Sequence, residues 1–97
     1  MVVPSVGVLI LELQIEQAHS LKDKRHYVKS LKDRLRSKFN VAVAEIDHQD
    51  LWQRGTVAVV TVSSDRTHAE QVLQHVEREA GSLLGGLLAG TTLEWLT

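Results

Sequence analysis

The chain has 97 residues, of which 43% are hydrophobic and 24% are charged, and it contains no cysteine. This length predicts one domain, 1–97, and the composition is typical of a folded globular protein and not of a disordered chain. The lack of cysteine excludes disulfides, thiolate zinc sites and cysteine nucleophiles, and it fits a reducing compartment.

The net charge of −1 conceals an uneven distribution. Residues 1–38 carry eight Lys and Arg against four Asp and Glu, a net of +4, and residues 39–97 carry three against eight, a net of −5. Such a division can steer charged partners or orient self-association. Residues 1–4 contain no positive charge, and Glu12 interrupts the apolar run that follows. We therefore expect no signal peptide, no membrane partner and a cytoplasmic location.

In chain order, alternating apolar residues first predict a strand over residues 6–15. Ser20 and Asp23 then have the spacing of a capping box, which predicts a helix over 21–38. The apolar residues of this helix recur at helical spacing and should pack on a sheet. They are Leu21, Val28, Leu31, Leu35 and Phe39.

Two segments rich in β-branched residues follow, at 41–47 and 56–63, and the polar residues between them predict an antiparallel hairpin. Ser64, Asp65 or Thr67 can cap a second helix, and Thr67 and Glu70 match a second capping box. Helical spacing of apolar residues continues to Ala80. The Gly- and Leu-rich residues 81–90 should end this helix, and residues 91–96 should form a last short strand.

The order β-α-β-β-α-β predicts an α+β fold, the ferredoxin-like sandwich, with a four-stranded antiparallel sheet and two helices on one face. The first and third strands are central in that fold. Their open face would carry Val6, Val8, Ile10 and one side of residues 57–63. Because exposed apolar patches commonly mark interfaces, we predict a homodimer through the sheet surface or an edge strand.

Basic residues form the most distinctive surface feature, a stripe along the first helix. At about 100° per residue, its five members span an arc of roughly 80°. Such a stripe can follow a phosphate backbone, although a solvated face paired with acidic groups of the protein's own dimer is the plain alternative. The stripe consists of Lys22, Arg25, Lys29, Lys32 and Arg36, with Lys24, Arg34 and Lys38 beside it.

The predicted hairpin contains a second polar cluster, which could in principle bind a metal or act as acid and base. Structural roles in a turn are the stronger interpretation, because no second ligand cluster is apparent and Asp and Gln suit turns. Trp52 should fill the core or a dimer interface. The cluster consists of Glu45, Asp47, His48, Asp50 and Arg54.

Known site patterns of this fold are missing from the sequence. An acylphosphatase-like loop needs Arg and Gly after the first strand, and residues 16–20 contain neither. An RNA recognition motif stacks bases on aromatic residues of the central strands, and neither predicted central strand has one. No P-loop or dinucleotide fingerprint is present. We therefore expect no enzymatic activity, no cofactor and no metal.

Two stretches resemble the bacterial YlxP-like family, also called domain of unknown function 503. They are SLKDKR at 20–25, and FNV at 39–41 leading to EIDHQDLWQR at 45–54. The resemblance implies a small cytoplasmic protein with a ferredoxin-like fold, often encoded beside genes for translation and ribosome maturation. It implies no catalytic residues.

Three functions remain open from the sequence. The first is a non-enzymatic module that binds RNA or a ribosomal particle through the first helix. The second is a dimeric regulatory module that binds a protein or a small ligand without nucleic acid. The third is an enzyme that uses His48 and Asp50.

Overall fold

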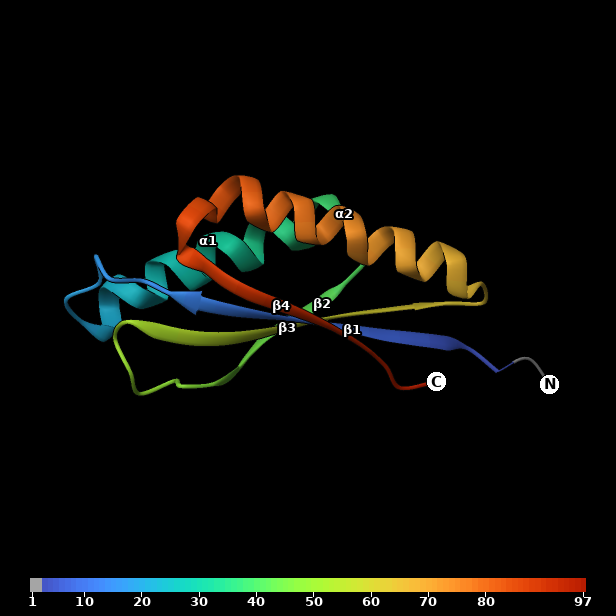
Figure 1. Ribbon diagram of the computed structural model, residues 1–97, viewed down its shortest axis with the longest axis horizontal. Helices are drawn as coiled ribbons and strands as arrows, with labels where there is room; N and C mark the ends of the chain where they lie inside the picture. The colour runs from blue at the N-terminus through green and yellow to red at the C-terminus, as the bar shows by residue number, and fades with distance from the viewer. Residues whose placement is uncertain (1–2) are drawn as a thin grey trace.

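The computed structural model describes residues 3–97, so Met1 and Val2 of the N-terminal segment considered above lie outside it. The chain forms four strands and two long helices in the order β-α-β-β-α-β (Figure 1). A 3₁₀ turn at Gly85–Leu87 precedes the last strand. The elements are β1 (Ser5–Gln14), α1 (Leu21–Lys38), β2 (Ala42–Asp47), β3 (Arg54–Ser63), α2 (Arg66–Leu84) and β4 (Leu88–Trp95).

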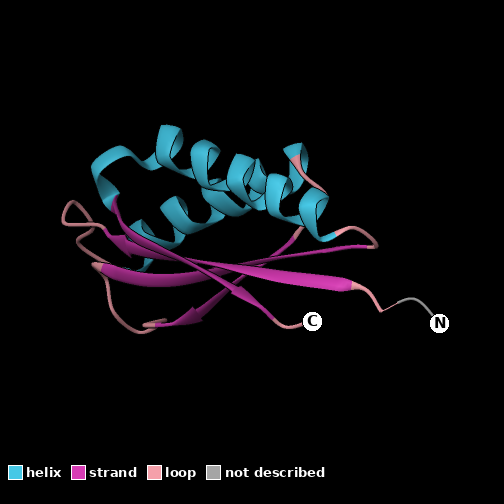
Figure 2. Cartoon of the chain, turned by 45° about the vertical axis from the view of Figure 1, so that its right-hand side comes forward, coloured by secondary structure: helices cyan, strands magenta, loops and turns pink. Residues whose placement is uncertain are grey.

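The strands form one antiparallel sheet in the order β2-β3-β1-β4. Both helices cover the same face of this sheet, as Figures 1 and 2 show from two directions. The predicted ferredoxin-like sandwich is confirmed, with β1 and β3 at its centre and β2 and β4 at its edges.

The core lies between the sheet and the helices. Alternate residues of β1 point into it, and Leu9, Leu11 and Leu13 are almost completely buried. Their partners on β3 include Val59 and Val57. The predicted apolar arc of α1 and the periodic residues of α2 complete the core. Every second residue of the strands and every third or fourth residue of the helices therefore contribute side chains to the same core.

The helix and strand ends differ from the expected ones mainly after residue 80. α2 continues through Gly81 to Leu84, because Leu84 still reaches the core. Gly85 then ends the helix with φ of 55°, a conformation that favours glycine. β4 consequently begins at Leu88 and not at residue 91. β3 begins at Arg54, two residues before the expected start.

The other face of the sheet carries no helix (Figure 2). Register places Val6, Val8 and Ile10 of β1 beside Val62, Val60 and Ala58 of β3. Val62 is 57% exposed. This agrees with the open face expected from the sequence. Within residues 3–97, neither helix has the length and hydrophobicity that a membrane span needs.

Candidate nucleic-acid interface

Lys24, which the sequence placed among the exposed cations of the first helix, is buried. Its side chain is 1% exposed, and Nζ lies 2.9 Å from Glu45 Oε2 on β2. Nζ also donates hydrogen bonds to the carbonyl oxygens of His48 and Arg54. Three acceptors thus surround a group with three N–H donors. The assignment of Lys24 to a nucleic-acid surface is wrong.

Helical spacing explains why Lys24 points inward. Positions 24, 28, 31 and 35 follow the i, i+4, i+7, i+11 pattern, and Val28, Leu31 and Leu35 are all buried. A cation on an apolar arc needs a buried acceptor, and Glu45 supplies one from the strand opposite. That periodicity was the available sequence signal for Lys24.

Lys24 also joins α1 to both ends of the loop between β2 and β3. Its acceptors His48 and Arg54 flank residues 49–53. His48 has φ of 60°, and the Asp47 carboxylate accepts a hydrogen bond from its backbone N–H. Gln53 donates its side-chain amide to Glu16 and Ala18 carbonyls. Hydrogen bonds to α1 and to the β1–α1 loop therefore hold this loop in place, at the end of the molecule where α1 begins (Figure 1).

Four cations of α1 line a groove between this helix and Glu45 of edge strand β2. This α1–β2 groove has a volume of about 380 Å³. Arg36 Nη2 donates a hydrogen bond of 3.0 Å to the Val43 carbonyl, which holds its guanidinium against the strand. The lining residues are Arg25, Val28, Lys29, Lys32, Asp33, Arg36 and Glu45.

The groove has a positive surplus. Asp33 is paired with Lys29 at 2.6 Å, and Glu45 is paired with Lys24. Both carboxylates are thus occupied, whereas Arg25, Lys32 and Arg36 contribute positive charge without an ion pair in the part of the chain that the structure describes. The hydrogen bond from Lys29 lowers the pKa of Asp33, and the charges of Arg36 and Lys32 lower it further.

The remaining cations of α1 lie away from this groove. Arg34 and Lys38 both contact the Glu79 carboxylate of α2, at 3.3 and 2.7 Å. Lys22 is exposed in the first turn. Arg34 and Lys38, which flank the predicted stripe, are therefore paired within the chain itself. Pairing of the stripe with acidic groups across a dimer is still a prediction.

The hairpin cluster does not form one site, because a β-bulge separates its carboxylates. Glu45 pairs with Val57, whose side chain faces the core, but Asp47 pairs with Thr56 after a register shift. Thr56 donates to Glu12 on the opposite, open face. In a regular strand Glu45 and Asp47 would share a face, and the bulge places them on opposite faces. Among residues 3–97, no three His, Asp or Glu side chains gather as a metal site would require.

Trp52 lies neither in the core nor against another part of the chain that covers it. Its exposed fraction is 53%, and that of Leu51 is 43%. A hollow of about 430 Å³ surrounds it, lined by Asp50, Leu51, Trp52, Gln53 and Arg54. The core alternative for Trp52 is wrong, and the interface alternative is still a prediction.

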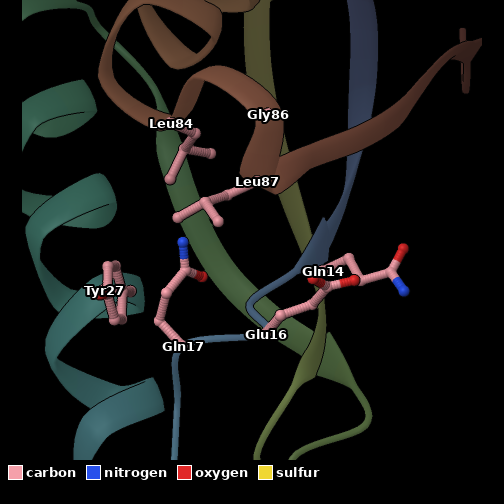
Figure 3. Close-up of a pocket in the computed structure, with 7 residues that line it drawn as sticks. All are labelled: Gln14, Glu16, Gln17, Tyr27, Leu84, Gly86 and Leu87. Carbon is pink, nitrogen blue, oxygen red and sulfur yellow. The ribbon is translucent and has the colours of Figure 1, made fainter.

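A further hollow of about 490 Å³ lies where the β1–α1 loop meets the end of α2. Figure 3 shows Tyr27 and Gln17 beside Leu84 and Leu87 in it. The two leucines provide an apolar wall, and Gln17 and Glu16 provide the polar groups. None of the residues singled out from the sequence as a candidate site lines it.

A family model matches residues 6–83, which include both stretches of the resemblance, and its description is "Protein of unknown function (DUF503)". The chain belongs to the DUF503 family. The DUF503 relative "Uncharacterized protein YlxP" of Bacillus subtilis (strain 168) is 42% identical over 71 residues, which cover 73% of this chain and 77% of that protein. Lys24 connects the two stretches, since it lies in the first and contacts Glu45, His48 and Arg54 of the second.

Solved structures share the fold of this DUF503 protein at low sequence identity. The de novo designed protein Foldit4 matches with a TM-score of 0.64 at 16% identity, over 98% of each chain. A "dimeric ferredoxin-like protein of unknown function" from Thermobifida fusca matches with a TM-score of 0.51 at 16% identity, over 95% of this chain and 91% of that one. These likenesses support the ferredoxin-like architecture.

Proposed function

We propose that this DUF503 protein acts by binding and not by catalysis, and that the α1–β2 groove binds the phosphate backbone of RNA. The observation that carries the proposal is the positive surplus of the groove. Arg25, Lys32 and Arg36 line it without a carboxylate of their own, because Asp33 and Glu45 are occupied by Lys29 and Lys24.

The geometry of the groove suits a chain of phosphates better than a single anion. From Arg25 to Arg36 the helix rises by about 16 Å. Cations distributed over such a length can each meet a different phosphate, and each contact releases counterions. Contacts of this kind do not require aromatic residues on the central strands.

The test compares two double variants that remove the same charge from the same helix. Arg25→Gln/Lys32→Gln removes two groove cations, and Arg34→Gln/Lys38→Gln removes the two that contact Glu79. RNA affinity is measured by fluorescence anisotropy from about 50 to 200 mM salt. The groove variant should bind roughly tenfold or more weakly and lose about 1.4 to 1.8 from the salt slope, for two phosphate contacts. The control should retain the wild-type slope.

An equal loss of RNA affinity in both double variants would contradict specific binding in the groove, because RNA would then respond only to the total charge of the helix. The absence of any RNA binding by the wild-type protein at about 50 mM salt would refute the proposal, because electrostatic binding is strongest at low salt.

The apolar open face of the sheet favours a second property, assembly into a homodimer, and we propose that a second copy covers this face. With strands about 4.8 Å apart and a rise of about 3.3 Å per residue, the face measures about 20 by 30 Å. Two copies would bury roughly 1,200 Å², the lower limit of specific interfaces. The dimeric Thermobifida fusca protein has the same architecture.

Sedimentation over a concentration series tests the dimer. Val62→Lys places a charge on the open face at an exposed residue, so the isolated fold tolerates it and only the dimer should be lost. Leu83→Lys is the matched control, because Leu83 is an exposed apolar residue of α2 on the helical side. A wild-type protein that stays monomeric, or a Val62→Lys variant that stays dimeric, contradicts the assignment.

A further inference from the structure

The loop between β2 and β3 presents a large aromatic side chain to solvent from a rigid base. Trp52 and Leu51 are about half exposed, although Trp is a residue that folding normally buries. The base is rigid because Lys24 binds the carbonyls of His48 and Arg54 at its two ends. The Leu51 N–H also closes a turn onto the His48 carbonyl.

Rigidity shows that the exposure of Trp52 is not a consequence of a loose loop. The neighbouring Gln53 is fixed on both sides of its peptide, since its carbonyl accepts from the Ile15 N–H and its side chain donates to Glu16 and Ala18. The loop thus holds the backbone on both sides of Trp52 while the indole remains outside. A side chain presented from a fixed backbone loses less entropy when a ligand packs on it than one on a mobile loop.

The base of this loop adjoins one end of the α1–β2 groove through the buried Lys24. Glu45 lines the groove and contacts Lys24, and Lys24 contacts the loop. Arg25, the first cation of the groove, follows Lys24 directly. A basic groove beside an exposed aromatic is the combination that binds single strands, because the groove follows the backbone and the ring accepts a base.

We propose that Trp52 stacks on an unpaired base of a single-stranded RNA whose phosphates lie in the α1–β2 groove. This inference rests on the proposed function and adds the class of RNA. Asp50 and Arg54 line the same hollow as Trp52 with opposite charges, so the hollow has no net charge and suits the uncharged face of a base. A base inside a duplex is already stacked on both faces and cannot accept the indole.

The experiment follows the emission of Trp52 in a Trp95→Phe background. The chain has two tryptophans, and Trp95 is packed beneath Arg66, whose Cζ lies 4.3 Å from its ring centre. Trp52 is then the only tryptophan that reports. A ten-nucleotide single-stranded RNA should quench its emission, and a blunt RNA duplex of the same length, which exposes only its two end base pairs, should quench it much less.

Affinity measurements separate stacking from charge. Trp52→Ala should weaken single-strand binding by about 5- to 150-fold, the range for one stacked base, and leave the salt slope unchanged. Trp52→Phe should recover part of the loss, because its ring can still stack. Because Trp52 lies outside the core, both variants should retain the wild-type melting temperature.

Each alternative result has one meaning. Wild-type affinity in Trp52→Ala, with the groove variant still impaired, overturns base stacking and leaves the groove proposal intact. Loss of dimerisation in Trp52→Ala with unchanged RNA affinity also overturns it, since the loop would then contact protein. Absence of RNA binding by the wild-type protein overturns both proposals.

Discussion

Lys24 is the one charged residue among residues 3–97 whose side chain is almost completely buried, and Lys24→Met removes its charge. The change leaves the Glu45 carboxylate, which is 17% exposed, without its cation. It also leaves the carbonyls of His48 and Arg54 without their donor. Breaking a buried ion pair by removing one partner costs about 3–5 kcal/mol.

That cost is a large part of the stability of a small domain, which is about 5–15 kcal/mol in total. For a chain of this length, 1 kcal/mol corresponds to about 4–8 °C in melting temperature. Lys24→Met should therefore melt at least about 12 °C below the wild type in a circular dichroism scan. Lys22→Met is the control, and its exposed side chain should change the free energy of unfolding by no more than about 0.5 kcal/mol.

A double variant distinguishes loss of the ion pair from loss of packing. Lys24→Met/Glu45→Met removes both charges, so the unpaired carboxylate disappears, and the double variant should be more stable than Lys24→Met alone. Equal melting temperatures for Lys24→Met and Lys22→Met would refute the burial of Lys24. A double variant less stable than Lys24→Met would refute the ion pair as the cause.

Three further variants test separate features. Gly7→Ala should lower the free energy of unfolding by about 1–3 kcal/mol in urea denaturation, because a Cβ there would lie 2.8 Å from Leu73 and 3.0 Å from the Trp95 ring. Gly90→Ala is the control and should be near neutral, because its Cβ would meet open space. Ser20→Ala should lower the free energy of unfolding by about 1 kcal/mol in the same assay, because the Ser20 hydroxyl caps α1 by accepting from the Asp23 N–H at 3.1 Å. An unchanged denaturation midpoint would contradict this cap. The hydrogen bond from Lys38 lowers the pKa of Glu79 below its ordinary 4.5, so this pair stabilises the fold above that pH and less as pH falls through the lowered value. Melting temperatures of the wild type should therefore fall more steeply than those of Glu79→Gln below pH 4.5, and parallel curves would contradict this.

Most of the fold could be predicted because local pattern and tertiary structure agree. Alternation in β1 and helical spacing in α1 each specify the buried face, and the Ser20 capping box marks where α1 begins. The capping box at Thr67 is wrong, because Asp65 caps α2 by accepting from the Thr67 N–H. The end of α2 could not be predicted in the same way. Gly81 suggested an early stop, but burial of Leu84 against the core outweighs the intrinsic cost of one glycine in the helix.

The site was less predictable, because it depends on pairs between elements far apart in sequence. A list of cations cannot show that Lys24 meets Glu45 or that Arg34 and Lys38 meet Glu79. The bulge before Asp47 was equally invisible, since one extra residue reverses the face on which a side chain lies. The exposure of Trp52 follows from anchors at Lys24 and Gln53, which only the folded chain brings to the loop.

The position of β1 between β3 and β4 has a consequence for how the chain folds. β1 precedes the other strands of this sheet in the chain, and its two partners begin only at Arg54 and Leu88. Its backbone N–H and C=O groups therefore have no strand partners until these residues have been synthesised. Pairing between strands that are far apart in sequence is also slow. During that interval β1 is an apolar strand with two open edges, the form most prone to pair with another chain. The period between synthesis and closure by β4 is thus when this protein is most exposed to aggregation.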